Sequence, residues 1–200
     1  MNIFKYLETP FIWEYFRSGL ELAIGVNAKR IAQMRARGVL DGNPSVLDVG
    51  CGSGHFSCIT KGNYVGLDLN VRFIQYAQKK RGGPNKIFRC ADVAALVGEQ
   101  QSSDVVLLVD ILHHHSDEQC EQLLANAARI SNKYIANFEP LRDQPHPIGR
   151  WRVERDLGSY MRTLDSLHEL FRRARLNVIE SSSNRVGFEN LSATLLKALK

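Results

Sequence analysis

The chain has 200 residues, of which 44% are hydrophobic and 24% charged, and its formal net charge is +5 at pH 7. These values are typical of one soluble globular domain with a sizeable apolar core, and they exclude a disordered or fibrous chain. No apolar run reaches the length of about 18 residues that a membrane span needs, and residues 1–5 lack the layout of a secretory signal. The four cysteines form no CxxC pair, so we expect reduced thiols in a cytoplasmic protein and no metal site.

Residues 1–44 are predicted to form an N-terminal helical lid or cap. Thr9 and Pro10 suit the N-cap and first turn of a helix, and apolar residues follow at helical spacing: Ile12, Tyr15, Phe16 and Leu20. A second helix is expected over 27–38, where Gly38 can end it.

From residue 45 to residue 200 the pattern alternates between strands and helices. The predicted strands are 45–50, 64–68, 86–90, 104–109, 133–138, 176–182 and 191–199, and the predicted helices are 54–60, 70–80, 92–98, 117–130 and 163–174. Ser116 and Gln119 form a capping box. The last two strands are expected to pair antiparallel across a short loop, 183–187, whereas 140–160 is expected to be irregular. The alternation predicts an α/β fold with a single doubly wound, mostly parallel sheet.

Residues 46–54 are the most informative stretch, because an apolar strand runs into a glycine loop. Gly50, Gly52 and Gly54 let the backbone pass close to a ligand where a Cβ atom would collide with it. The dinucleotide fingerprint needs its third glycine one residue further on, and a P-loop needs a Gly-Lys-Ser/Thr ending. Neither pattern is present, which argues against a nicotinamide-dependent oxidoreductase and a P-loop enzyme.

Three acidic residues stand at the ends of three successive predicted strands. Asp48 would face a cationic group, Asp68 can accept both hydroxyls of a ribose, and Asp92 would lie next to an adenine edge. Each acid alone is better explained by a helix cap or a turn. The three together favour a nucleoside whose other end carries a positive charge.

At this point the chain resembles the class I S-adenosylmethionine-dependent methyltransferases. The resemblance rests on residues 46–54, on Asp68 after Val65-Gly66-Leu67, on Ala91-Asp92, and on residues 104–114. It implies a seven-stranded sheet, with six parallel strands and an antiparallel last strand, and S-adenosylmethionine as the cofactor. The implied cofactor-binding residues are Asp48, Gly50, Cys51, Gly52, Gly54, Asp68, Leu69, Asp92, Val93 and Asp110. Among them, Asp68 would hold the ribose, and Leu69 and Val93 would flank the adenine ring.

The catalytic candidates follow the fourth and fifth strands. His113 or His114 is a candidate general base, because histidine titrates near neutral pH, although packing and solvation of the loop explain the pair more simply. Glu139 would either contact the substrate or cap its strand. No spacing of acids and histidines suggests a metal site.

The sequence therefore predicts a cytoplasmic enzyme that methylates an oxygen or nitrogen of a small molecule. Arginines between residues 150 and 175 keep an RNA substrate open as an alternative. A non-catalytic cofactor-binding module stays open as well, because no residue is an unambiguous base. The chain lacks the Asn/Asp-Pro-Pro-aromatic box that DNA amino-methylating enzymes carry.

Overall fold

The structure is a computed structural model that describes residues 25–98, 102–155 and 160–198. The helix predicted around Thr9 and Pro10 lies outside the described residues. The chain divides into two compact units, Met1–Asp92 and Val93–Lys200. A separate lid over residues 1–44 stays a prediction.

The first unit contains α2 (Val26–Ala36) and three parallel strands, β1 (Val46–Val49), β2 (Tyr64–Asp68) and β3 (Lys86–Cys90). All four residues of β1 are buried, which is typical of a parallel strand covered on both faces. Between β2 and β3 runs α3 (Val71–Arg81), which buries Ile74 and Ala77. Asn70 caps α3 by accepting the N–H of Arg72 at 3.0 Å. These elements match the predicted ones closely.

The helix predicted over 54–60 is wrong in both length and type. The structure has only η2, a turn of 3₁₀ helix at His55–Cys58. The N–H of Ser57 bonds to the carbonyl of Gly54, and the N–H of Ile59 bonds to that of Phe56, each at 3.1 Å. Gly54 has φ 80°, outside the helical region, so the chain enters this turn from a left-handed residue.

The second unit contains the rest of the sheet and its helices. Its elements are α4 (Val93–Gly98), β4 (Ser103–Val109), η3 (Leu112–His114), α5 (Asp117–Ile130), β5 (Ser131–Pro140), α6 (Pro147–Arg155), α7 (Leu164–Arg173), β6 (Leu176–Val186) and β7 (Glu189–Ala198). The predicted capping box is confirmed, because the Ser116 hydroxyl accepts from the N–H of Gln119 and the Gln119 side chain accepts from the N–H of Ser116.

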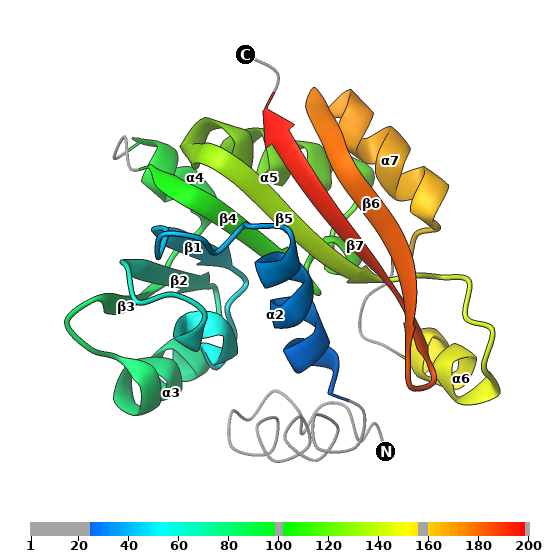
Figure 1. The fold of residues 1–200 in the computed structure, drawn as a ribbon, viewed down its shortest axis with the longest axis horizontal. Helices are drawn as coiled ribbons and strands as arrows, with labels where there is room; N and C mark the ends of the chain where they lie inside the picture. The colour runs from blue at the N-terminus through cyan, green and yellow to red at the C-terminus, as the bar shows by residue number, and fades with distance from the viewer. Residues whose placement is uncertain (1–24, 99–101, 156–159, 199–200) are drawn as a thin grey trace. The chain divides into compact units, whose positions relative to one another are not determined.

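The seven strands follow the order β3-β2-β1-β4-β5-β7-β6 (Figure 1). β4 and β5 are parallel, whereas β7 is antiparallel to both β5 and β6, between which it runs. The predicted Rossmann-like sheet with an antiparallel last strand is confirmed.

Two predictions for the second unit are wrong. The segment 140–160 is not wholly irregular, because α6 occupies its middle, with Pro147 at the first helical position that suits proline. The predicted loop 183–187 is shorter: β6 continues to Val186, which pairs with Glu189 across the two residues Gly187 and Phe188. Gly187 has φ 61°, the conformation that a two-residue hairpin loop needs.

Candidate active site

The glycine loop after β1 is held by backbone bonds and left-handed glycines. The N–H groups of Gly50 and Cys51 both donate to the carbonyl of Leu67, at 2.8 Å each. Gly50, Gly52 and Gly54 have φ values of 74°, 51° and 80°. A Cβ atom on Gly52 would meet no protein atom within 4 Å, whereas one on Gly54 would collide with Phe88. Gly52 therefore presents bare backbone to open space, and Gly54 is required by packing.

Asp68 fastens this loop to the end of β2. One carboxylate oxygen accepts the N–H of Gly52 at 2.9 Å, and the other accepts the N–H of Asn70 at 2.8 Å. A carboxylate offers about four acceptor sites, so two remain free of these bonds. Asp68 is partly exposed, and the side chain can therefore accept two further hydroxyl groups.

The residues expected around an adenine ring differ in exposure. Leu69 is 70% exposed, so its side chain is available for contact with an apolar ligand. Asp92 is exposed too, whereas Val93 is 3% exposed and belongs to the core. The thiol of Cys90, at the end of β3, lies 3.5 Å from the carbonyl oxygen of Leu69.

Asp48 lies inside β1 and is 1% exposed. Its carboxylate accepts the hydroxyl of Tyr64 at 2.5 Å. Burial raises the pKa of Asp48 to about 7, while the Tyr64 bond lowers it and the charge of Asp68 raises it further. Burial also raises the pKa of the Cys51 thiol well above its usual range. Sequence reasoning did not single out Tyr64, although a hydroxyl within an apolar strand implies a buried partner.

In the second unit, the loop after β4 begins at Asp110, which has φ 52°. The N–H of Asp110 donates to the carbonyl of Phe138 at 2.9 Å, and the chain then turns into η3. A left-handed aspartate is uncommon and bends the chain sharply at the carboxyl end of the strand. Asp110, one of the residues expected to bind the cofactor, is exposed.

Glu139, at the end of β5, is 1% exposed and faces this loop. One carboxylate oxygen accepts the N–H groups of Ile111 and Leu112, at 2.9 and 2.8 Å. The other accepts the N–H of His113 at 3.3 Å and lies 2.6 Å from Nδ1 of the same residue. These contacts use about all the acceptor sites of a carboxylate.

The three histidines of the loop have different environments. His113 is buried against Glu139, whereas His114 is exposed and its ring centroid lies 4.1 Å from that of His113. His115 turns back, with Nδ1 3.0 Å from the carbonyl oxygen of Ile111. The structure therefore groups His113 with Glu139 and leaves the ring of His114 accessible.

The described residues contain no group of three or more His, Cys, Asp or Glu side chains arranged to hold a metal ion. Nor do they include a helix long and apolar enough to cross a membrane.

Residues 46–133 match a family described as "Methyltransferase domain". These residues form a methyltransferase domain, and the match is consistent with a class I enzyme. Its cofactor is S-adenosylmethionine, and the matched range includes the glycine loop, Asp68 and the loop after β4.

Solved structures share the methyltransferase fold at low sequence identity. Magnesium protoporphyrin IX methyltransferase from Synechocystis PCC 6803, solved with bound SAH, is 17% identical, with a TM-score of 0.69 over 94% of this chain and 88% of that one. A chain from the complex between the Haloferax volcanii Trm112 methyltransferase activator and the putative methyltransferase is 18% identical, with a TM-score of 0.73 over 100% and 99%. The cyclase SpnF is 15% identical, with a TM-score of 0.67 over 85% and 80%. No curated protein sequence matches the chain significantly.

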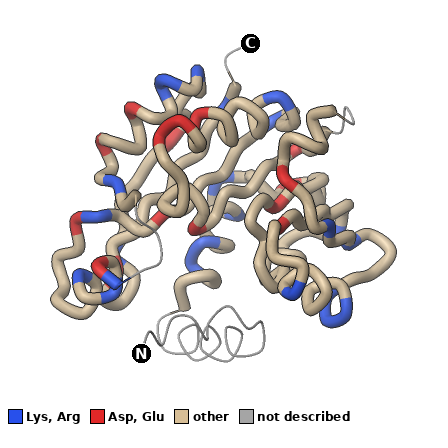
Figure 2. Tube along the Cα trace, turned by 180° about the vertical axis from the view of Figure 1, so that it is seen from behind, with Lys and Arg blue, Asp and Glu red and all other residues tan. Residues whose placement is uncertain are grey.

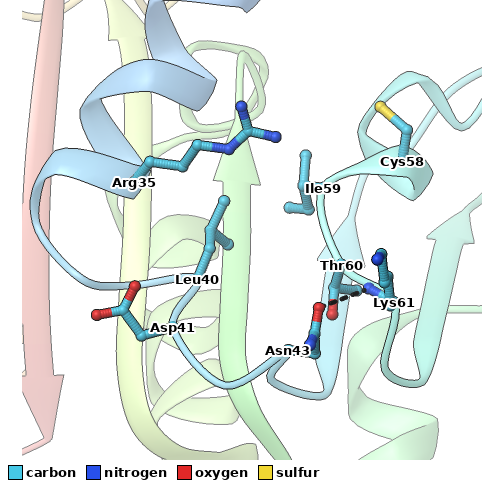
Figure 3. A pocket seen from close by; sticks show the side chains of 8 residues that line it. All are labelled: Arg35, Leu40, Asp41, Asn43, Cys58, Ile59, Thr60 and Lys61. Carbon is cyan, nitrogen blue, oxygen red and sulfur yellow. Dashed lines mark hydrogen bonds between the residues drawn. The ribbon is translucent and has the colours of Figure 1, made fainter.

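A pocket of about 420 Å³ lies elsewhere on the first unit of the methyltransferase (Figure 3). Its lining comes from α2 and from the segments that precede β1 and β2: Arg35, Leu40, Asp41, Asn43, Cys58, Ile59, Thr60 and Lys61. These segments lie at the amino ends of the strands, whereas Gly50 and Asp68 lie at the carboxyl ends. Because ligands of open α/β sheets bind at the carboxyl ends, we do not assign the cofactor to this pocket.

Proposed function

We propose that this methyltransferase transfers a methyl group to an oxygen or nitrogen atom of a small molecule, mainly by positioning the two reactants. The cofactor-binding part of this proposal rests on the hydrogen bond from the N–H of Gly52 to the carboxylate of Asp68. Gly52 faces open space, and Asp68 holds its N–H while keeping acceptor sites for two hydroxyls. A ribose fits those sites, and the exposed Leu69 next to Asp68 suits the face of an adenine ring.

The bound cofactor would supply an activated methyl group on a sulfonium, so the protein's task is to hold the acceptor in line with it. Positioning of this kind contributes about 7–11 kcal/mol to a reaction. The loop after β4 supports such a role, because its turn is tightly hydrogen-bonded and bears the accessible ring of His114. We propose His113 and His114 as the candidate bases for an acceptor that arrives protonated.

The RNA alternative receives less support from the second unit. Four of the arginines between residues 150 and 175 form ion pairs: Arg152 with Glu189, Arg162 with Asp117, Arg172 with Glu169, and Arg173 with Asp117 and Glu121. Figure 2 shows basic and acidic residues interspersed along the trace. We therefore favour a small molecule, and the free thiols of all four cysteines support the proposed cytoplasmic location.

Calorimetry with S-adenosylhomocysteine tests the cofactor site directly. We expect the wild-type protein to bind it and Asp68→Ala to lose most of the affinity, because two hydroxyls of the ribose lose their acceptor. Asp104→Ala is the matched control, since Asp104 pairs with Lys133 in the second unit. Retained affinity in Asp68→Ala would overturn the proposed site.

Transfer of labelled methyl groups to a panel of small hydroxyl and amine compounds tests the reaction itself. Turnover of one of them would support the proposal. Cofactor binding without turnover on small molecules or RNA would instead favour a non-catalytic module.

A further inference from the structure

Arg162 is a buried cation with an unusual set of partners. Its side chain is 8% exposed, and it lies between α6 and α7 in the chain. One terminal nitrogen donates to the carbonyls of Leu112 and Tyr160, at 2.8 and 3.1 Å. The other donates to the carbonyl of His115 at 2.9 Å and to Asp117 at 2.7 Å, and Nε donates to the same Asp117 oxygen at 3.0 Å.

The contacts of Arg162 and Glu139 are complementary. Glu139 accepts the N–H groups at the start of the turn, those of Ile111, Leu112 and His113. Arg162 donates to the carbonyls of Leu112 and His115 in the same turn. The N–H of Tyr160 supplies a further bond, to the carbonyl of His113 at 3.1 Å.

We propose that Arg162 is a positioning residue for methyl transfer, which together with Glu139 fixes the turn Ile111–His115 and so the rings of His113 and His114. The assignment rests on the proposed function, in which this turn faces the methyl acceptor. It also gives Glu139 a role: its acceptor sites are used by the turn, so it orients His113 instead of taking a proton from substrate.

The orientation of His113 follows from the same contacts. A carboxylate that already accepts three backbone N–H groups acts as an acceptor toward Nδ1, so we assign the donor role to Nδ1. The proton-accepting nitrogen of a neutral His113 is then Nε2. Displacing the turn would move this nitrogen and the ring of His114 together.

Arg162→Lys tests the proposal, and Arg173→Met is its matched control. Lysine keeps the charge but lacks the planar fork that reaches Asp117 and three carbonyls at once. Arg173 pairs with the same Asp117, and with Glu121, from the surface, so its replacement removes these two ion pairs and leaves the bonds of Arg162 to the turn in place.

We expect Arg162→Lys to shift the imidazole nitrogen signals of His113 and His114 in NMR spectra and to speed amide exchange at Ile111–His113. With the acceptor found by the labelled-methyl assay, kcat should fall by up to about 10²-fold while KM for S-adenosylmethionine stays within a factor of about two, because misplacement by about 1 Å has that effect. Arg173→Met should leave signals and kcat at wild-type values.

The proposal is overturned if Arg162→Lys gives wild-type imidazole signals, or if both variants lower kcat equally. Glu139→Gln supplies a second measurement if Arg162→Lys does not fold: it should shift the His113 signals and the pH dependence of kcat, and unchanged values of both would count against the proposal. Failure of the proposed function is distinguishable, because the wild-type protein would then fail to bind S-adenosylhomocysteine or to methylate any acceptor while the NMR comparison still reports on the turn.

Discussion

At the scale of single residues, Asp48 shows how a strand that is otherwise apolar tolerates a carboxyl group. The hydroxyl of Tyr64 supplies one hydrogen bond, but burial dominates and raises the pKa of Asp48 to about 7. Near neutral pH the residue is thus divided between its protonated and charged forms. A cationic ligand nearby would favour the charged form, in agreement with the role expected from the sequence.

Asp48→Asn is predicted to change how stability depends on pH. The unfolded aspartate has a pKa of about 3.9, so between about pH 4 and 7 the folded protein holds a proton that the unfolded chain has lost. The wild-type free energy of unfolding should therefore fall as pH rises through this window, by at most about 1.4 kcal/mol per pH unit. Asparagine still accepts the Tyr64 hydroxyl but does not titrate.

Urea unfolding of both proteins at pH 5, 6, 7 and 8 measures this difference, with pH values chosen around the window of about 4–7. The variant should gain stability relative to wild type up to about pH 7 and keep a constant difference above it. A difference that does not change with pH would show that Asp48 is not buried as described.

At the scale of structural elements, two glycines of the loop after β1 differ in what an added methyl group would meet. Gly52 and Gly54 are both left-handed, so an alanine at either position carries a similar backbone cost of about 1–2 kcal/mol. Only at Gly54 would the new methyl group also overlap Phe88 and contact Ala77. Alanine substitutions at the two positions can therefore be compared as a matched pair of variants within one loop.

Gly54→Ala is predicted to lose roughly 1–3 kcal/mol more stability than Gly52→Ala, because of the overlap with Phe88. Gly52→Ala should fold well and bind S-adenosylhomocysteine much more weakly, since its methyl group occupies the open space. Denaturation midpoints and calorimetry on both variants check the pair. Equal stability losses, or wild-type affinity in Gly52→Ala, would contradict this division.

Helices and strands could be predicted from the sequence where residues nearby in the chain determine their bounds. The bounds of β2, β3 and α5 agree with prediction to the residue, because alternation, caps and turn residues frame them. The turn η2 was predicted as a longer helix, although the left-handed Gly54 that precedes it leaves room for only one 3₁₀ turn, and the helix α6 was missed because its surroundings depend on contacts distant in sequence. Gln144 bonds to both backbone groups of Asn190, 46 residues away, and Arg152 reaches Glu189 at 2.6 Å.

In the candidate site, too, only the residues with a local sequence pattern could be predicted. The glycines and Asp68 are recognisable because their spacing is local. Arg162 has no such signal, since its bonds reach Leu112, 50 residues earlier. Glu139 was singled out, but its engagement by the turn depends on the pairing of β4 with β5, which no local pattern specifies.

For the whole molecule, the net charge of +5 raises the question of RNA binding. A protein that neutralises several phosphates loses affinity steeply with added salt. Because four arginines of the late region are already ion-paired, we expect weak binding of a single-stranded oligouridine and a shallow salt dependence between about 50 and 200 mM salt. Fluorescence anisotropy measures both; tight binding with a steep slope would restore the RNA alternative.

The position of β7 between β5 and β6 also has a kinetic consequence. The N–H of Glu139 on β5 bonds to the hydroxyl of Ser192 on β7, 53 residues later. The segment between the two strands contains α6, α7 and β6, so the pairing of β5 with β7 closes a long loop. Closing such a long loop before its contacts form is entropically slow. Refolding should therefore show an early phase from the β6–β7 hairpin and a later one as that hairpin docks on β5, and until then β5 leaves a strand edge open to aggregation.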